Sequence, residues 1–403
     1  MPGRKRFSRG SMKNWQPRIP LAEQLLIGAL SEIPGPRVLC TTVGRGHLAW
    51  AAAAAGRQVR CCVLDQFVAE LIRLEGEPVA STAPTDDRAG KSKRPRSERK
   101  ALAHAWQEED ETGPVRPTAR DVQAAGGALE IVCEADLGGQ DYDAVLMPVD
   151  TRLETELTRE LLQEACFVLR EGGRFLSAVG KPDDHWLNDE LRKLYPKVTR
   201  LPSDTGVLYM ATRGELPRKR KQFDAEYAFR DEGRLIYGKT RPGVFSHRSL
   251  DGGARALLKA MTVRPTDRVI DMGCGSGAVA LAAALRAPQG SVLAVDAQAR
   301  AIQCTQWGAE RNEITNLQTL LCADGQLPDP GTFDLLAGNP PYFSDYRIAE
   351  LFLQTALRSL KSGGCVWMVT KTPTWFEERM PQLFADVESV PVGSYHVISG
   401  QKG

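Results

Sequence analysis

Residues 269–277 read Val-Ile-Asp-Met-Gly-Cys-Gly-Ser-Gly, and the Ala-rich segment 278–285 follows them directly. An apolar stretch, a glycine-rich turn and a helix-forming segment in this order predict one βα unit of a parallel sheet. Glycine suits such a turn because it adopts positive φ angles and lets a ligand approach the backbone. The helix beginning near Ala278 would present its N-terminal N–H groups to that ligand. The stretch therefore predicts an α/β fold with a ligand site at the end of this strand.

The first half of the chain repeats the same pattern. Residues 38–65 align without a gap with residues 269–296, at a constant offset of 231 positions. Both copies pass through a glycine-containing turn, enter an Ala-rich segment and close on an apolar stretch ending in Asp. Later in each copy a predicted helix ends in a Gly-Gly pair, at 172–173 and 363–364, and a strand follows. This repetition predicts two tandem, doubly wound (Rossmann-like) α/β domains built from right-handed βαβ units.

Composition and charge divide the chain further. We expect a basic tail at 1–14, a first domain at 15–212, a basic linker at 213–240 and a second domain at 241–403. Within the first domain, residues 78–127 are poor in large apolar residues and carry a basic run followed by an acidic one. Segregated charge blocks of this kind are typical of a solvated, disordered insertion.

The overall composition excludes several classes of protein. The 403 residues are 42% hydrophobic with a formal net charge of +2, which excludes wholesale disorder and a uniformly cationic nucleic-acid wrapper. The longest apolar runs, 48–55 and 278–285, are far shorter than the roughly 20 residues of a membrane span. The basic N-terminus lacks the apolar region of a secretory signal. Nine cysteines without a CxxC pair indicate a reduced protein. We therefore expect a cytoplasmic monomer without a metal.

Two acidic residues extend the predicted ligand site. Asp296 ends the next strand, 21 residues after Gly275, where a carboxylate would hold ribose hydroxyls. Asp324 ends a third strand and would lie beside an adenine amino group. The spacing G-x-G-x-G differs from the G-x-G-x-x-G of dinucleotide sites, although a glycine-rich turn alone is also compatible with a simple tight turn. The combination favours S-adenosylmethionine.

The most specific motif lies at 333–342, where an apolar strand ends in Asn339-Pro340-Pro341-Tyr342. The amide oxygen of Asn339 and the carbonyl of Pro340 would accept both hydrogens of an exocyclic amine on a flat base. That arrangement frees the nitrogen lone pair by positioning and electrostatics, without a strong base. Tyr342 would stack on the base. The motif therefore predicts methyl transfer to an amine nitrogen.

With these motifs in place, the second half resembles class I S-adenosylmethionine-dependent methyltransferases that carry Asp, Asn or Ser followed by Pro-Pro and an aromatic residue. It is most similar to the RsmC/RlmG family of ribosomal RNA guanine-N2 methyltransferases. Residues 242–246 (Pro-Gly-Val-Phe-Ser), residues 250–253 (Leu-Asp-Gly-Gly) and the tandem architecture support this resemblance. It covers roughly residues 15–75 and 128–403, most strongly 242–371.

The resemblance implies roles for particular residues and a partner. The implied partner is ribosomal RNA or a ribosomal subunit. Members often carry His and Gly shortly after the Pro-Pro-aromatic motif, whereas here Phe343, Ser344 and Asp345 follow. The implied cofactor-binding residues are Asp271, Gly273, Gly275, Gly277, Asp296, Asp324 and Asn339; the implied catalytic residues are Asn339, Pro340, Pro341 and Tyr342; and the implied substrate-binding residues are Phe245, Tyr342 and Phe343.

In the first domain the same positions have changed. Cys40 and Thr42 stand where the second copy has Asp271 and Gly273, and residues 147–150 read Met-Pro-Val-Asp. We therefore expect this degenerate methyltransferase-like domain to bind no cofactor and to serve RNA positioning, docking or stability. The basic runs at 91–100 and 218–221 and the N-terminal tail are candidate RNA contacts, or only solvated segments.

The motif leaves alternative functions open. Adenine N6 in nucleic acid and a protein glutamine side chain present comparable amines to an Asn-Pro-Pro-Tyr loop. A third alternative is a non-catalytic RNA-binding or ribosome-assembly factor descended from an enzyme, which the retained Asp271, Asp296, Asp324 and Asn339 disfavour.

Overall fold

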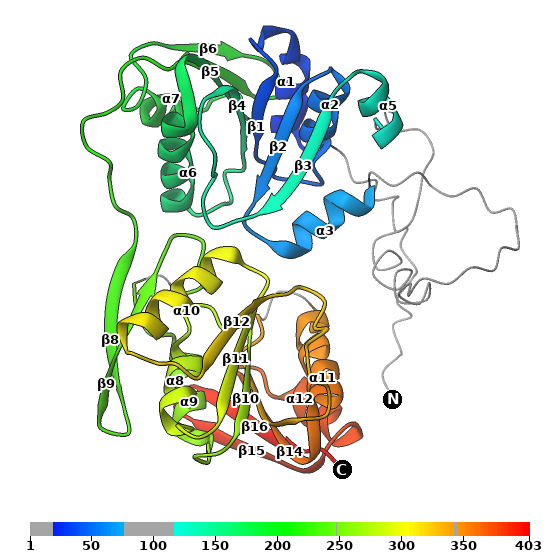
Figure 1. Cartoon of the computed structure of the whole chain (residues 1–403), viewed down its shortest axis with the longest axis vertical. Coiled ribbons are helices and arrows are strands. Elements are labelled where there is room, and N and C mark those ends of the chain that lie inside the picture. The colour runs from blue at the N-terminus through cyan, green and yellow to red at the C-terminus, as the bar shows by residue number, and fades with distance from the viewer. Residues whose placement is uncertain (1–18, 76–116, 247, 342–344) are drawn as a thin grey trace, which may run out of the picture.

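The structure is a computed structural model that describes residues 19–75, 117–246, 248–341 and 345–403. These residues form two lobes that lie one above the other along the long axis of the molecule (Figure 1). Each lobe is built on a seven-stranded sheet. The expected tail at 1–14 and residues 78–116 of the expected insertion lie outside the described residues.

In the first lobe, helices pack against both faces of the sheet. Its elements are α1 (Leu21–Gly28), β1 (Arg37–Cys40), α2 (His47–Ala54), β2 (Gln58–Val63), α3 (Gln66–Glu75), α5 (Ala119–Ala124), β3 (Ala128–Cys133), β4 (Tyr142–Val149), α6 (Thr155–Val168), β5 (Leu169–Val179), α7 (Trp186–Leu191), β6 (Val198–Pro202) and β7 (Val207–Thr212).

The second lobe begins with a hairpin and then repeats the arrangement. Its elements are β8 (Ala225–Asp231), β9 (Arg234–Thr240), α8 (Gly252–Ala260), β10 (Arg268–Met272), α9 (Ala278–Arg286), β11 (Ser291–Asp296), α10 (Ala299–Arg311), β12 (Leu317–Leu321), β13 (Phe333–Gly338), α11 (Arg347–Ser359), β14 (Leu360–Thr370), α12 (Thr374–Arg379), β15 (Ala385–Val392) and β16 (Tyr395–Gln401).

The two sheets have the same topology. Their strand orders are β3-β2-β1-β4-β5-β7-β6 and β12-β11-β10-β13-β14-β16-β15. β1 pairs in parallel with β2 and β4, as β10 does with β11 and β13, and the last two strands of each sheet are antiparallel. The predicted tandem of Rossmann-like domains is confirmed.

Helices cover both faces of each sheet, which explains why the central strands are apolar throughout. In the second lobe, α8, α9 and α10 contribute buried residues to the core on one face, and α11 and α12 to the core on the other. In the first lobe the corresponding sets are α1, α2, α3 and α5 on one face and α6 and α7 on the other. The helices cover the faces of the sheets and not the strand ends, and such sheets bind ligands at the carboxyl ends of their strands.

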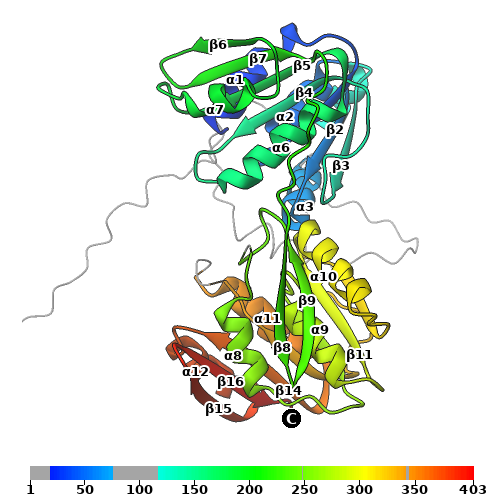
Figure 2. The same cartoon turned by 90° about the vertical axis from the view of Figure 1, so that its left-hand side faces the viewer.

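The segment expected to be a linker is more structured than the sequence suggested. β8 and β9 form an antiparallel hairpin around Glu232 and Gly233, which have φ angles of 44° and 81°. Phe229 and Ile236 of this hairpin are buried in the core of the second lobe. Figure 2 shows the hairpin running alongside that lobe. The hairpin therefore packs as part of the second lobe.

The end of the expected insertion also has regular structure. Residues 119–124 form α5, which begins with a capping box in which Thr118 and Asp121 satisfy each other's backbone N–H groups. Val122 is buried against the first lobe. The globular part of the first lobe therefore resumes before residue 127.

Equivalent loops of the two repeats form part of the contact between the lobes. The Gln66 N–H donates to the Ala297 carbonyl and the Ala299 N–H donates to the Leu64 carbonyl, both at 2.8 Å. Asp65 also pairs with Gln298 in an antiparallel bridge. Since residues 65 and 296 correspond in the repeat, the carboxyl end of β11 faces the carboxyl end of β2 across the contact.

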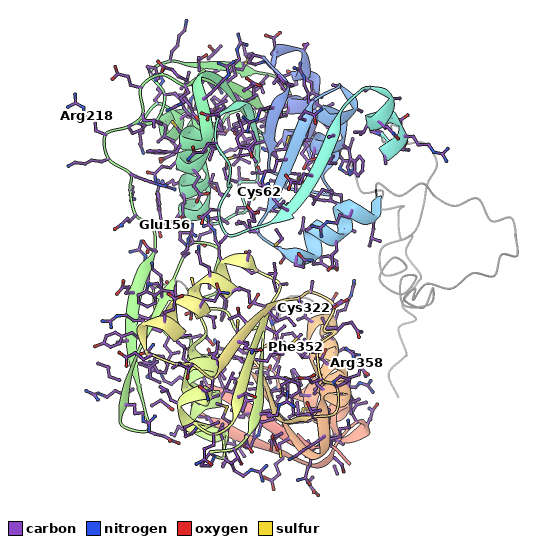
Figure 3. All side chains as sticks on the ribbon, viewed as in Figure 1. Cys62, Glu156, Arg218, Cys322, Phe352 and Arg358 are labelled. Carbon is purple, nitrogen blue, oxygen red and sulfur yellow. The ribbon has the colours of Figure 1, made fainter. Side chains whose placement is uncertain are left out.

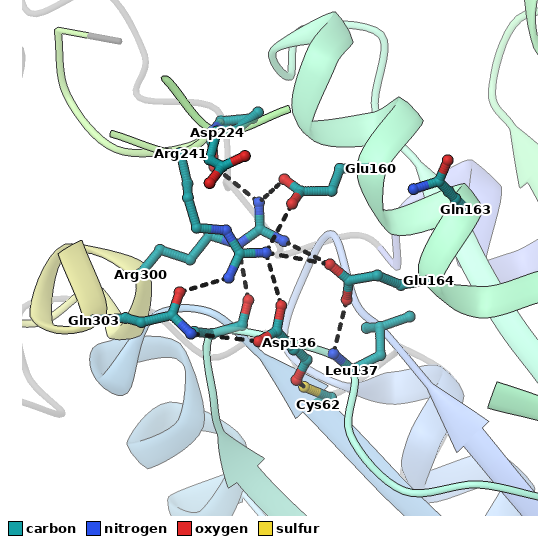
Figure 4. Close-up of polar contacts among 12 residues, drawn as sticks. Cys62, Asp136, Leu137, Glu160, Gln163, Glu164, Asp224, Arg241, Arg300 and Gln303 are labelled. Atoms are coloured by element: carbon teal, nitrogen blue, oxygen red, sulfur yellow. Dashed lines mark hydrogen bonds and ion pairs between the residues drawn. The ribbon is translucent and has the colours of Figure 1, made fainter. Parts of the chain in front are cut away.

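A cluster of buried ion pairs connects the two lobes at this contact (Figure 4). The Arg300 side chain is fully buried and donates to Glu160 at 2.6 Å and to Glu164 at 3.2 Å. Arg241 donates to Glu160 and to Asp136, both at 2.7 Å. The arginines belong to the second lobe and the carboxylates to the first. Burial raises the pKa of Glu164 to about 7, although Arg300 opposes the shift.

Candidate active site

The glycine loop after β10 has the predicted backbone conformation. Gly273, Gly275 and Gly277 have φ angles of 74°, 54° and 81°. A Cβ atom on Gly277 would lie 2.7 Å from the Thr305 hydroxyl, whereas one on Gly275 would meet no heavy atom within 4 Å. The loop is therefore tightly packed at its end and open at Gly275, where a ligand can approach the backbone.

Asp271 lies beneath this loop. Its carboxylate is buried and accepts a hydrogen bond from the Ala280 N–H at 2.9 Å, in the first turn of α9. Burial raises the pKa of Asp271 to about 7. The side chain thus ties the strand end to the helix and fixes the path of the loop between them.

Asp296 joins the glycine loop to the next loop of the sheet. Its two oxygens accept hydrogen bonds from the Gly275 N–H at 2.8 Å and the Gln298 N–H at 2.9 Å. Burial raises the pKa of Asp296, and these backbone hydrogen bonds lower it in part. Asp296 therefore lies where the sequence places it, at the open edge beside Gly275.

Asp324 follows the neighbouring strand β12. It accepts hydrogen bonds from the Gln326 N–H at 3.0 Å and the Cys322 thiol at 3.3 Å. Figure 3 shows Cys322 on the side of the second lobe that faces the first. Asp324 is thus held in a turn at the same edge of the sheet as Asp296.

Asn339 and the two prolines directly follow β13, the strand beside β10. The Asn339 amide nitrogen donates to the Asp251 carboxylate at 2.8 Å, and Asp251 also accepts the Ala254 N–H at the start of α8. Pro340 is buried and Pro341 is half-buried. The strand order β12-β11-β10-β13 therefore places Asp324, Asp296, the glycine loop and Asn339 on neighbouring loops.

Three aromatic residues complete the predicted site. Phe245 is 66% exposed, an unusual environment for so large an apolar side chain. It lies in the segment that leads to Asp251. Tyr342 and Phe343 fall outside the described residues, so their predicted stacking roles stay predictions.

Two supporting residues were not assigned from the sequence. The sequence assigns no role to Asp251, which belongs to the segment Leu-Asp-Gly-Gly at 250–253. An Asp at a helix start is, however, a typical N-cap residue. The Tyr227 hydroxyl shares a hydrogen bond of 2.7 Å with Ser276 in the glycine loop. Since Tyr227 comes from β8, the hairpin braces that loop from outside.

The described part of the chain was also searched for other cavities, metal sites and membrane spans. A cavity of about 580 Å³ lies between the lobes beside the ionic cluster, lined by Arg220, Lys239 and Trp307 among others, but Asp296, Asp324 and Asn339 do not line it. Within the described ranges no group of three or more His, Cys, Asp or Glu is placed to hold a metal. No described helix is long and apolar enough to cross a bilayer.

Comparison with known proteins agrees with this geometry. Residues 236–399 match the family described as methyltransferase small domain. A ribosomal RNA small subunit methyltransferase C from Pseudoalteromonas atlantica is 30% identical over 153 residues, which cover 37% of this chain and 44% of the relative. A ribosomal RNA large subunit methyltransferase G from Ectopseudomonas mendocina is 32% identical over 164 residues, which cover 38% and 43%.

The second lobe matches the methyltransferase small domain and is similar to methyltransferases of the RsmC and RlmG type. The resemblance inferred from the glycine loop and the Asn-Pro-Pro motif is confirmed. These alignments span less than half the length of the relatives.

A solved structure extends the likeness in fold to both lobes. The Thermus thermophilus 16S rRNA N2 G1207 methyltransferase (RsmC), solved with AdoMet and guanosine, superposes with a TM-score of 0.67 over 96% of this chain and 93% of that one. Its sequence identity is 18%, so the likeness concerns the fold. The tandem of two methyltransferase-like lobes is thus shared with that protein.

In the first lobe a different carboxylate occupies the position beneath the loop. Cys40, the counterpart of Asp271, is fully buried and has a thiol in place of the carboxylate. Glu23 of α1 reaches in and accepts hydrogen bonds from the Val43 and Leu48 N–H groups, both at 3.2 Å, and from the Thr42 hydroxyl. Burial raises the pKa of Glu23. In the first lobe a side chain from α1 therefore occupies backbone N–H groups of the loop that is equivalent to the glycine loop of the second lobe.

Proposed function

We propose that this protein transfers a methyl group from S-adenosylmethionine to the exocyclic N2 amine of a guanine in ribosomal RNA. The observation that carries the proposal is the position of Asn339-Pro340-Pro341 directly after β13, on the loop next to the glycine loop. The relatives are named ribosomal RNA methyltransferases, and the structural neighbour was solved with guanosine. These names support ribosomal RNA as the substrate and guanine as the base.

The residues at this edge fit S-adenosylmethionine. Gly275 leaves open space at the loop, and the Asp296 carboxylate stands beside it as an acceptor for hydroxyl groups. We assign cofactor binding to Gly273, Gly275, Gly277, Asp296 and Asp324, with Asp271 holding the loop and Asn339 at its border. The cofactor, when bound, supplies an electrophilic methyl group.

The remaining chemistry belongs to the side chains and backbone of the Asn-Pro-Pro loop. The Asn339 amide oxygen and the Pro340 carbonyl accept the two amine hydrogens, which favours a pyramidal nitrogen with an available lone pair. Pro341 restrains the backbone so that these acceptors keep their positions. Tyr342, Phe343 and Phe245 contact the flat base.

The two lobes have different roles in this proposal. Residues 241–403 form the catalytic domain, and residues 15–212 form a domain that binds no cofactor and orients the RNA or the ribosomal subunit. Basic residues of the tail, of the insertion and of 218–221 contact phosphates, so affinity falls steeply with salt. The protein acts as a cytoplasmic monomer and needs no metal, since the acceptors of the Asn-Pro-Pro loop do the positioning.

Methyl transfer by the purified full-length protein tests this proposal. Ribosomal RNA from a strain that lacks the gene is incubated with methyl-labelled cofactor, digested to nucleosides and analysed by mass spectrometry. We expect label in N2-methylguanosine and its loss with Asn339→Ala. Label in N6-methyladenosine or in a protein glutamine would assign the other amines. Cofactor binding without transfer to any substrate would support the non-catalytic alternative.

A further inference from the structure

The side chain of Asn339 is anchored by a residue 88 positions earlier in the chain. Its Nδ2 donates to Oδ2 of Asp251 at 2.8 Å. The same carboxylate oxygen accepts the Ala254 N–H at 3.0 Å, so Asp251 also caps α8. The helix start therefore holds the carboxylate in place while the carboxylate holds the amide.

This contact selects one of the two orientations of the amide. A carboxylate only accepts hydrogen bonds, whereas an amide donates through Nδ2 and accepts through Oδ1. A flipped amide would bring two oxygens together and lose a charge-assisted hydrogen bond. With Nδ2 bound to Asp251, Oδ1 is the atom left for another partner, and no described residue donates a hydrogen bond to it.

The backbone at Gly253 packs against the same pair. A Cβ atom there would lie 2.8 Å from Asp251 Oδ2, 3.0 Å from Asn339 Nδ2 and 3.1 Å from Asn339 Oδ1. Only a hydrogen fits at this position without displacing the amide. Gly253 and Asp251 thus fix both the plane and the direction of the Asn339 side chain.

We propose that Asp251 is a positioning residue that presents the Asn339 Oδ1 as an acceptor to the target amine. This inference rests on the proposed methyl transfer to an exocyclic amine. An amide that rotated freely would present its NH2 group for part of the time, which repels an amine hydrogen. The carboxylate removes that unproductive orientation before the substrate binds, and its contribution therefore falls on kcat.

Exchange of the two side chains tests the proposal with full-length protein and ribosomal RNA. We expect Asp251→Asn to lower kcat about 10- to 100-fold with little change in KM, since the hydrogen bond to Asn339 is no longer charge-assisted and a neutral amide no longer excludes the flipped orientation of Asn339. We expect Asn339→Asp to be at least as impaired, because two carboxylates then face each other. In the double variant D251N/N339D the new amide turns its Nδ2 to the new carboxylate and gives up the Ala254 cap, which lowers stability but again leaves one carboxylate oxygen toward the amine. Recovery of kcat by tenfold or more over Asn339→Asp is the predicted result.

A matched variant separates anchoring from helix capping. Asp251→Ser keeps an N-cap oxygen for α8 but cannot reach Asn339. We expect it to lower the unfolding temperature only by the loss of its hydrogen bond to Asn339, to bind S-adenosylmethionine with wild-type affinity in calorimetry, and to lose kcat like Asp251→Asn. Wild-type kcat in Asp251→Ser, or no recovery in the double variant, would overturn the proposal.

A readout without catalysis keeps this test independent of the proposed function. In unfolding experiments, the effects of Asp251→Ser and Asn339→Ala should be non-additive, because both remove the same hydrogen bond. If the wild type transfers no methyl group to ribosomal RNA, the proposed function fails while this coupling still reports the anchor. Additive effects would show that the two side chains do not interact, and would overturn the inference.

Discussion

Replacement of Arg300 by methionine should destabilise the protein strongly. The guanidinium is fully buried and donates to Glu160, to Glu164 and to the carbonyls of Ala135 and Pro242. Methionine fills much of the space but leaves two buried carboxylates with Arg241 as their main cation. Breaking a buried ion pair from one side costs about 3–5 kcal/mol. We expect a loss of that size in the free energy of unfolding at pH 8, measured by urea titration with circular dichroism.

The pH dependence of this loss has a defined sign. The pKa of Glu164 is already raised to about 7, above its ordinary value of 4.5. An acid with a raised pKa in the folded state loses stabilising free energy as pH rises from the unfolded pKa to the folded one. Without Arg300 that pKa rises further, so at pH 5.5 Glu164 is protonated and the penalty shrinks. The deficit of Arg300→Met should therefore be smaller at pH 5.5 than at pH 8.

An exposed ion pair between the same lobes provides the control. Arg248, which is 59% exposed, pairs with Glu156 at 2.9 Å. Arg248→Met should cost no more than about 1 kcal/mol, because water solvates both partners when they separate. If Arg300→Met costs no more than Arg248→Met, or if its deficit does not shrink at low pH, the buried cluster does not join the lobes in the way described.

Three further predictions concern the two loops and the exposed aromatic residue. Asp271→Asn keeps an acceptor for the Ala280 N–H but removes an acid whose pKa is raised to about 7, so the melting temperature should fall less between pH 4 and pH 7 than that of the wild type; an equal fall in both proteins would assign it to other groups. Glu23→Ala leaves the Val43 and Leu48 N–H groups without their acceptor and should cost about 1–3 kcal/mol of unfolding free energy, while calorimetry still finds one cofactor per chain; a second bound cofactor would contradict the account of the first lobe. Phe245→Ala should leave the melting temperature unchanged, since the ring is 66% exposed, but raise KM for RNA about tenfold through lost stacking; an unchanged KM would remove Phe245 from the site.

The sequence was informative wherever the determining signal is local. The strand, glycine turn and helix at 269–285 follow from residues in direct succession, and the same pattern recurs at 38–55. Because these units have only a few ways to assemble, two local patterns were enough to predict two doubly wound sheets. The placement of Asp296, Asp324 and Asn339 at one edge follows from the same rule, since each ends a parallel strand.

The hairpin β8–β9 was not predicted, because its apolar pattern is short and a basic run lies shortly before it. Its buried hydrophobic residues are only Phe229 and Ile236, and the basic run at 218–221 shortly before it suggested a solvated linker. A two-stranded hairpin has little stability by itself. Its structure depends on packing against the second lobe, which no local pattern reveals.

The supporting side chains were also beyond local inference. Asp251 lies 88 residues from Asn339, and Arg300 lies 140 residues from Glu160. Glu23 takes over the position beneath the first loop from a different element than Asp271 does in the second lobe. The repeat therefore predicted that an acid was missing at Cys40, but not that an acid from α1 replaces it.

We propose that the protein methylates a guanine amine in ribosomal RNA through Asn339 of the second lobe. The most direct measurement is mass spectrometry of ribosomal RNA nucleosides from a strain without the gene, complemented with wild type or with Asn339→Ala. We predict that one N2-methylguanosine disappears on deletion, returns with the wild type and stays absent with Asn339→Ala. An unchanged nucleoside profile on deletion, or full restoration by Asn339→Ala, would contradict the claim.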